Sequence, residues 1–123
     1  MGEKNFRLVI IETPYNADTP KGIENNLVYA RACMKDCLSK GESPFASHLL
    51  YTQPGVLRDN IPEERKLGIQ AGLAWGKLAE ASIFYTDRGI SSGMKQGFVQ
   101  AVLDARPREF RTLPNYQPKH INK

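Results

Sequence analysis

The alternation of short apolar segments with long segments of helical periodicity is the strongest constraint on the fold of this chain. Residues 6–11 and 82–86 are apolar and rich in β-branched and aromatic side chains, with little polar alternation. Such runs are typical of strands that are buried on both faces. Residues 44–51 and 109–113 are predicted as the second and fourth strands in chain order.

Three predicted helices separate these strands. Residues 22–40 form the first, which Gly41 follows as a cap, and the second covers residues 60–79. The third begins at Ser91 or Ser92 and reaches about Asp104, before Pro107. The second helix is expected to start with Asn60 as its cap, Pro62 in the first turn and Glu63 in a capping-box position.

The order β-α-β-α-β-α-β predicts an α/β fold with a mostly parallel four-stranded sheet between layers of helices. The chain has 123 residues, enough for one domain, which we place at residues 1–113 with a tail at 114–123. The predicted architecture is a small, flavodoxin-like three-layer sandwich. Since no apolar run reaches 18 residues and no signal peptide is recognised, we expect a cytoplasmic protein with no membrane partner.

The net charge is +4, and +3 of it lies in the last 20 residues. A basic tail of this kind is either a solvated chain end or a contact for phosphate. One possible function is therefore a nucleic-acid-binding or purely structural role. No aromatic–basic motif supports nucleic acid as a partner. Cys33 and Cys37 lack the further cysteines of a zinc site and are read as small core residues, so we expect no metal and no cofactor.

In parallel α/β sheets, ligands bind beyond the carboxyl ends of the strands. The segment from Asp87 to Gly93 follows a predicted strand there and opens a helix, with glycines and serines suited to a phosphate or carboxylate. The alternative is an ordinary turn with a serine cap. Ligand-binding candidates at these strand ends are Pro14, Tyr15, Ser47, His48, Asp87, Gly89, Ser91, Ser92, Gly93 and Met94.

The ends of the first two strands and this loop resemble the nucleoside 2-deoxyribosyltransferase-like family, and particularly its small relatives in bacteriophage genomes. The resemblance extends over about residues 6–113 and rests on three motifs in order: Glu12-Thr13-Pro14-Tyr15, Ser47-His48, and Thr86-Asp87 to Gly93-Met94. It implies a deoxyribosyltransferase-like fold and a ribose-bearing ligand.

Active members of that family use a glutamate nucleophile four residues beyond the glycine of the loop, a position that is Gly97 here. The resemblance therefore favours binding of a nucleotide or ribosylated nucleotide derivative without turnover, which in a phage protein would sequester a host nucleotide signal. The enzyme alternative is an N-glycosidase or deoxyribosyl-transferring activity that uses Glu12 with Asp87 as two catalytic carboxylates.

Each polar candidate also has a purely structural interpretation. Glu12 would then pair with a loop N–H or an arginine, and His48 would be a hydrogen-bonded structural residue rather than an acid. Tyr15 and Tyr51 would pack rather than stack on a base.

Gly68, Gly72 and Gly76 recur every four residues and form one stripe of the second predicted helix, beside Trp75. Each glycine costs a helix about 0.5–1 kcal/mol relative to alanine, so close packing should compensate. The stripe contacts either another part of the same chain or a second copy, and the family resemblance favours a homo-oligomer.

Overall fold

The computed structural model describes residues 5–116, and its sheet has four parallel strands in the order β2-β1-β3-β4. The strands are β1 (Arg7–Glu12), β2 (Glu42–Phe45), β3 (Ala81–Tyr85) and β4 (Arg108–Arg111). Val9 is opposite Ala81, and Ser82 is opposite Arg108. The predicted α/β class and parallel sheet are therefore confirmed. Lys119 and Lys123 of the predicted tail lie outside the described residues.

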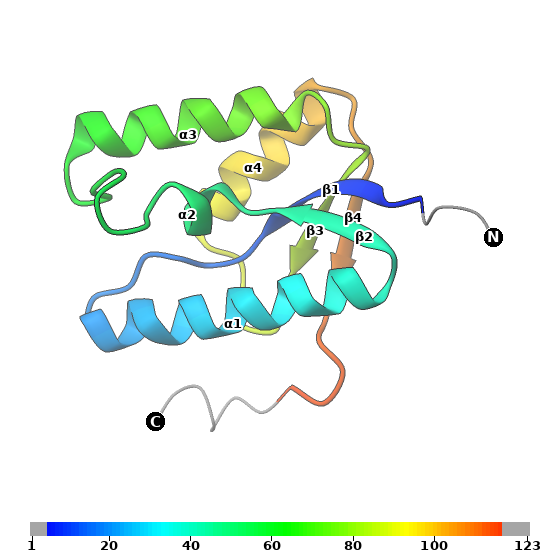
Figure 1. Ribbon diagram of the computed structural model, residues 1–123, viewed down its shortest axis with the longest axis horizontal. Helices are drawn as coiled ribbons and strands as arrows, with labels where there is room; N and C mark the ends of the chain where they lie inside the picture. Colours follow the sequence, from blue (N-terminus) through cyan, green and yellow to red (C-terminus); the bar gives the residue numbers. More distant parts are fainter. Residues whose placement is uncertain (1–4, 117–123) are drawn as a thin grey trace.

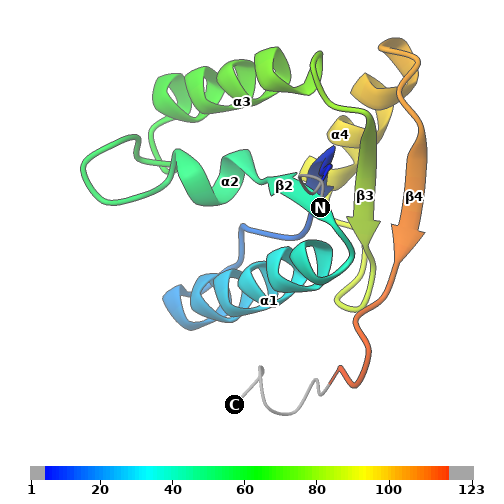
Figure 2. The ribbon, with the colours of Figure 1, turned by 45° about the vertical axis from the view of Figure 1, so that its right-hand side comes forward.

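Helices lie on both faces of the sheet, as Figures 1 and 2 show. One face carries α1 (Pro20–Ser39), and the other carries α3 (Pro62–Gly76) and α4 (Ser92–Leu103). The main core lies on the α1 side, where alternate residues of β1 and β3 pack against Tyr29, Cys33 and Cys37. Both cysteines are buried and free, as predicted for core residues.

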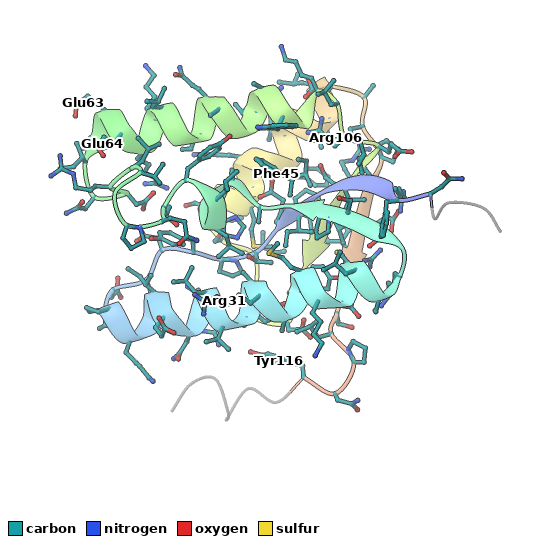
Figure 3. The ribbon with its side chains drawn as sticks, in the orientation of Figure 1. Arg31, Phe45, Glu63, Glu64, Arg106 and Tyr116 are labelled. Carbon is teal, nitrogen blue, oxygen red and sulfur yellow. The ribbon has the colours of Figure 1, made fainter. Side chains whose placement is uncertain are left out.

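The opposite face of the sheet is more polar. The alternate residues of β1 and β3 that point there include Glu12 and Ser82. Phe84 is buried beneath Phe98 and the exposed Phe110, whose ring centroids lie 5.4–5.6 Å from that of Phe84. Ser82 accepts a hydrogen bond from Nε of the buried Arg106 at 2.9 Å. Figure 3 shows Arg106 on this side of the sheet, near the end of α3, and Tyr116 on the α1 side. This polar face also carries Glu12.

The prediction for residues 44–51 is wrong in one respect. The strand ends at Phe45, and Ser47–Leu50 form the short helix α2, so Ser47 and His48 lie on a helix rather than at the end of a strand. Pro44 is tolerated because β2 lies at the edge of the sheet.

The other boundaries differ by a few residues from the prediction. Helix α3 begins after Ile61 without a side-chain cap, so the predicted capping box at Asn60 is absent. Ser91 caps α4 as expected, and Gly41 follows α1 with a φ of +77°, a conformation that favours glycine. Of the helices within residues 5–116, none has both the length and the apolar character needed to cross a bilayer.

Candidate functional site

A cavity of about 350 Å³ lies between the polar face of the sheet, α2, α3 and the first turns of α4. This volume is in the range of small-molecule sites. Eight sequence-predicted ligand or catalytic residues line it together: Glu12, Tyr15, Ser47, His48, Ser91, Ser92, Gly93 and Met94. Residues from three distant parts of the chain therefore meet at the carboxyl ends of the strands, as expected for a ligand site in this kind of sheet.

Glu12 provides one of the two carboxyl groups that line the cavity; the other, that of Asp59, forms an ion pair with Arg65. A Cβ built on Gly97 would overlap the carboxyl group of Glu12, so the Glu12 side chain occupies the space that the missing side chain at Gly97 leaves. Within the described part of the chain, no hydrogen bond or ion pair joins Glu12 to another residue. Burial raises the pKa of Glu12 to about 8, although the Arg106 guanidinium opposes this shift. The carboxyl group is therefore mostly protonated at neutral pH, and it can donate a hydrogen bond.

His48 lies on the wall formed by α2. Its Nε2 atom is 2.6 Å from Oγ1 of the buried Thr13, and its ring meets that of Tyr15 edge-on. Burial lowers the pKa of His48 to about 4, so the imidazole is neutral at physiological pH. His48 is thus anchored to the end of β1, and it can offer a neutral hydrogen-bonding group but no positive charge.

The first turn of α4 forms the third side of the cavity. Oγ of Ser91 accepts a hydrogen bond from the Met94 N–H at 3.2 Å, and the Ser91 N–H donates to Met94 Sδ at 3.4 Å. Ser91 thus serves mainly as the cap. The first N–H groups of a helix have no acceptor within it, so those of Ser92 and Gly93 are available at the positive end of the helix dipole.

Three predicted site residues lie outside this cavity. The Asp87 carboxylate accepts hydrogen bonds from the Tyr29 hydroxyl at 2.6 Å and from the Leu113 N–H at 3.0 Å, on the α1 side of the sheet. Asp87 therefore joins α1 to the segment after β4. It does not pair with Glu12, so the expected arrangement of two catalytic carboxylates is absent. Pro14 is buried beside the cavity, and Gly89 serves the turn with a φ of +87°.

The glycine stripe of α3 packs within the same chain. A Cβ on Gly72 would lie 2.7 Å from Cβ of Ser47, and one on Gly68 would lie 3.2 Å from Leu57. Gly76 contacts the Arg106 guanidinium, which donates a hydrogen bond to the Gly76 carbonyl oxygen at 2.6 Å. The glycines therefore allow α3 to approach α2 and Arg106, which accounts for them without a second copy. The homo-oligomer itself stays a prediction.

The sequence comparisons identify a family. The family model described as a domain of unknown function (DUF7768) matches residues 7–111. The chain belongs to this family. No curated protein matches it in sequence.

A solved structure is similar to this DUF7768 chain in fold. It is the 2-deoxyribosyltransferase from the psychrotolerant bacterium Bacillus psychrosaccharolyticus, described as a biocatalyst for nucleoside synthesis. The TM-score is 0.65 at 13% identity, and the match covers 89% of this chain and 75% of that chain. The deoxyribosyltransferase-like fold is thus confirmed, and the expected similarity holds at the level of the fold.

The sequence did not predict most of the α3 residues that line the cavity. Arg65, Ile69, Gly72, Leu73 and Gly76 line it at helical spacing, and the last part of this stripe was interpreted only as a packing surface. Arg106 enters from the turn before β4, where Ala105 has a φ of +54°. No local motif marks Arg106, because its role depends on the pairing of β4 with β3.

Proposed function

We propose that this DUF7768 chain binds a nucleotide or a ribosylated nucleotide derivative in the cavity between α2, α3 and α4, without turnover. The observation that carries the proposal is the convergence of the Glu12, Ser47-His48 and Ser91–Met94 motifs on one cavity. The deoxyribosyltransferase-like fold supports a nucleoside-type ligand. In a phage protein, such binding would sequester a host nucleotide signal.

The state of Glu12 favours binding over covalent turnover. A carboxylate must be ionised to attack an anomeric carbon, whereas burial keeps the pKa of Glu12 near 8 and the group mostly protonated at neutral pH. Gly97 holds no carboxylate of its own, and Asp87 lies on the other side of the sheet. Asp59, the other carboxylate of the lining, is paired with Arg65. At Glu12, the cavity therefore offers a donor to a ligand rather than an anionic nucleophile.

Native mass spectrometry after incubation with a panel of nucleosides and nucleotides tests the binding. We expect a stoichiometric complex, and intact ligand should be recovered when the protein is denatured by heat. The same spectra report the number of copies of the chain in the complex. If no complex forms with any member of the panel, the proposal is wrong.

The second candidate is an N-glycosidase, and the position of Glu12 against Gly97 is the observation that favours it. A protonated carboxyl group in this cavity could act as a general acid toward a departing base. Chromatography of free base over several hours separates the two functions. Base release by the wild type that disappears in Glu12→Gln would establish the enzyme and overturn the binding-only proposal.

A further inference from the structure

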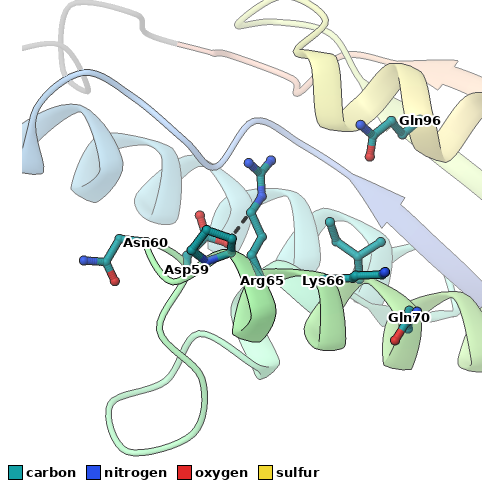
Figure 4. A pocket seen from close by; sticks show the side chains of 8 residues that line it. Asp59, Asn60, Arg65, Lys66, Gln70 and Gln96 are labelled. Atoms are coloured by element: carbon teal, nitrogen blue, oxygen red, sulfur yellow. Dashed lines mark ion pairs between the residues drawn. The ribbon is translucent and has the colours of Figure 1, made fainter.

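A second hollow, of about 460 Å³, lies between α3 and α4 outside the cavity. Figure 4 shows its polar residues: Asp59, Asn60, Arg65, Lys66 and Gln70 on the α3 side, and Gln96 across from them on α4. We call this hollow the outer groove. It shares Asp59, Arg65, Ile69 and Gln96 with the walls of the inner cavity, so the two spaces adjoin.

The outer groove carries two cationic groups, Arg65 and Lys66. The side chain of Arg65 is 43% exposed, and its Nε atom is 3.8 Å from Oδ1 of Asp59. Figure 4 shows the terminal nitrogens of Arg65 pointing away from α3. Lys66 is exposed, and the structure gives it no ion-pair partner among residues 5–116. Two cations therefore face one carboxylate.

The amides of the groove are also available to a ligand. No hydrogen bond joins the side-chain amide of Asn60, Gln70 or Gln96 to another described residue, and each amide has two N–H donors. A groove with two cations and several amide donors suits phosphate oxygens, which accept charge-assisted hydrogen bonds from arginine and lysine. The inner cavity differs. Its cations are Arg65, which both spaces share, and Arg106, whose guanidinium already donates to Ser82 and to the Gly76 carbonyl oxygen.

We propose that the outer groove is a phosphate subsite of the same ligand, so that the chain takes a nucleotide with several phosphates. Its nucleoside part lies in the inner cavity, and its outer phosphates lie on Arg65 and Lys66. This inference rests on the proposed function. It adds that the ligand carries several phosphates and that it extends from the inner cavity into the outer groove. Arg65 stands at the junction of the two spaces, and Lys66 contacts only the outer phosphates.

Calorimetric titration tests the subsite with the nucleoside, the 5′-monophosphate and the 5′-triphosphate of adenine, guanine, cytosine and uracil, and with inorganic tripolyphosphate. For the base that binds, we expect the triphosphate to bind more tightly than the nucleoside. Lys66→Ala should weaken triphosphate binding by about tenfold, the loss of one charge-assisted hydrogen bond, and leave nucleoside binding unchanged. Higher salt should reduce the triphosphate advantage.

Lys95→Ala is the matched control, because Lys95 is an exposed lysine of α4 next to Gln96 but lines neither space. It should leave all affinities unchanged. Equal affinities for nucleoside and triphosphate, or equal effects of Lys66→Ala and Lys95→Ala, would each overturn the subsite and leave nucleoside binding intact. Tripolyphosphate binding as tight as that of the nucleotide would overturn the shared ligand, because the nucleoside part would then add nothing to the affinity. Failure of every compound to bind would overturn the proposed function and the subsite together.

Discussion

At residue 97, the missing side chain determines where the carboxyl group of Glu12 can lie. A Cβ on Gly97 would be 2.8 Å from Oε1 of Glu12 and closer still to the other carboxyl oxygen. This contact cannot be predicted from the sequence, because 85 positions separate Glu12 from Gly97. Only the pairing of β1 with β3 and the packing of α4 bring the two residues together.

Gly97→Ala should destabilise the protein. The added methyl group must displace the Glu12 carboxyl group, and overpacking of this kind costs about 1–3 kcal/mol. Urea unfolding measures the loss, and Glu12→Ala in the same chain should recover most of it. Gly93→Ala is the control, since its Cβ would meet only Ser91 Oγ at 3.9 Å and should stabilise α4. Equal effects of the two glycine substitutions would disprove the contact.

Ser92→Ala should weaken binding of a nucleotide that places an anionic group at the first turn of α4. Loss of one charge-assisted hydrogen bond costs about 1.5–3 kcal/mol. Calorimetry measures the affinity, and Ser39→Ala, at the far end of α1, serves as the control. Unchanged affinity in Ser92→Ala would remove this hydroxyl from the site. The fold should change little, because Ser91 and not Ser92 caps α4.

Among the elements, the long ones were predictable and the short one was not. Residues 22–40 contain enough helical turns for apolar periodicity to identify α1, and the buried strand β3 is recognisable from its composition alone. Helix α2 has four residues, fewer than the period needs to become visible, and it lies in an aromatic, apolar run that favours strand. It packs against α3, where Gly72 lies against Ser47 and Gly68 against Tyr51, and the local sequence does not reveal these contacts.

The contact between α2 and α3 predicts the effect of Gly72→Leu. A leucine cannot fit against Ser47, whose Cβ would lie 2.7 Å from the new Cβ, so α3 must move away from α2. We expect a clearly lower melting temperature in a dilute sample. Leu78→Ala, at a 68% exposed position just beyond α3, is the control.

Light scattering on the same samples distinguishes packing within the chain from packing between copies. If Gly72→Leu changes the mass of the particle but leaves the melting temperature unchanged, the stripe serves an oligomer and the contact with Ser47 is unimportant. If neither quantity changes, the stripe has no packing role.

For the whole molecule, Glu12 predicts a fall in stability as the pH rises from 4.5 to about 8. Burial raises the pKa of Glu12 from 4.5 in the unfolded chain to about 8 in the folded one, so folding takes up a proton. The stability that Glu12 contributes is complete below pH 4.5 and is lost as the pH rises to 8. His48, whose pKa falls to about 4, changes stability only below pH 6.5 and in the opposite direction.

Urea unfolding between pH 6.5 and 8.0 isolates this effect. The wild type should lose at most about 2 kcal/mol over this interval, because one proton is taken up on folding. Glu12→Gln, which stays neutral, should show a flatter profile. Parallel profiles for the two proteins would show that the Glu12 carboxyl group is ionised in the folded state at neutral pH.

The polar lining of the cavity restricts which substitutions can occur together during the evolution of this chain. Ser47 lies against Gly72, and Glu12 lies against Gly97, so in both cases a cavity-lining group and a glycine share one volume. A mutation at either member alone leaves a steric overlap or a hole, and only paired changes keep the site filled. Positions 12 and 97 should therefore covary among descendants of a common ancestor. A chain that gains a glutamate at position 97 must give up the present placement of Glu12, so the two arrangements of the carboxyl group are mutually exclusive solutions.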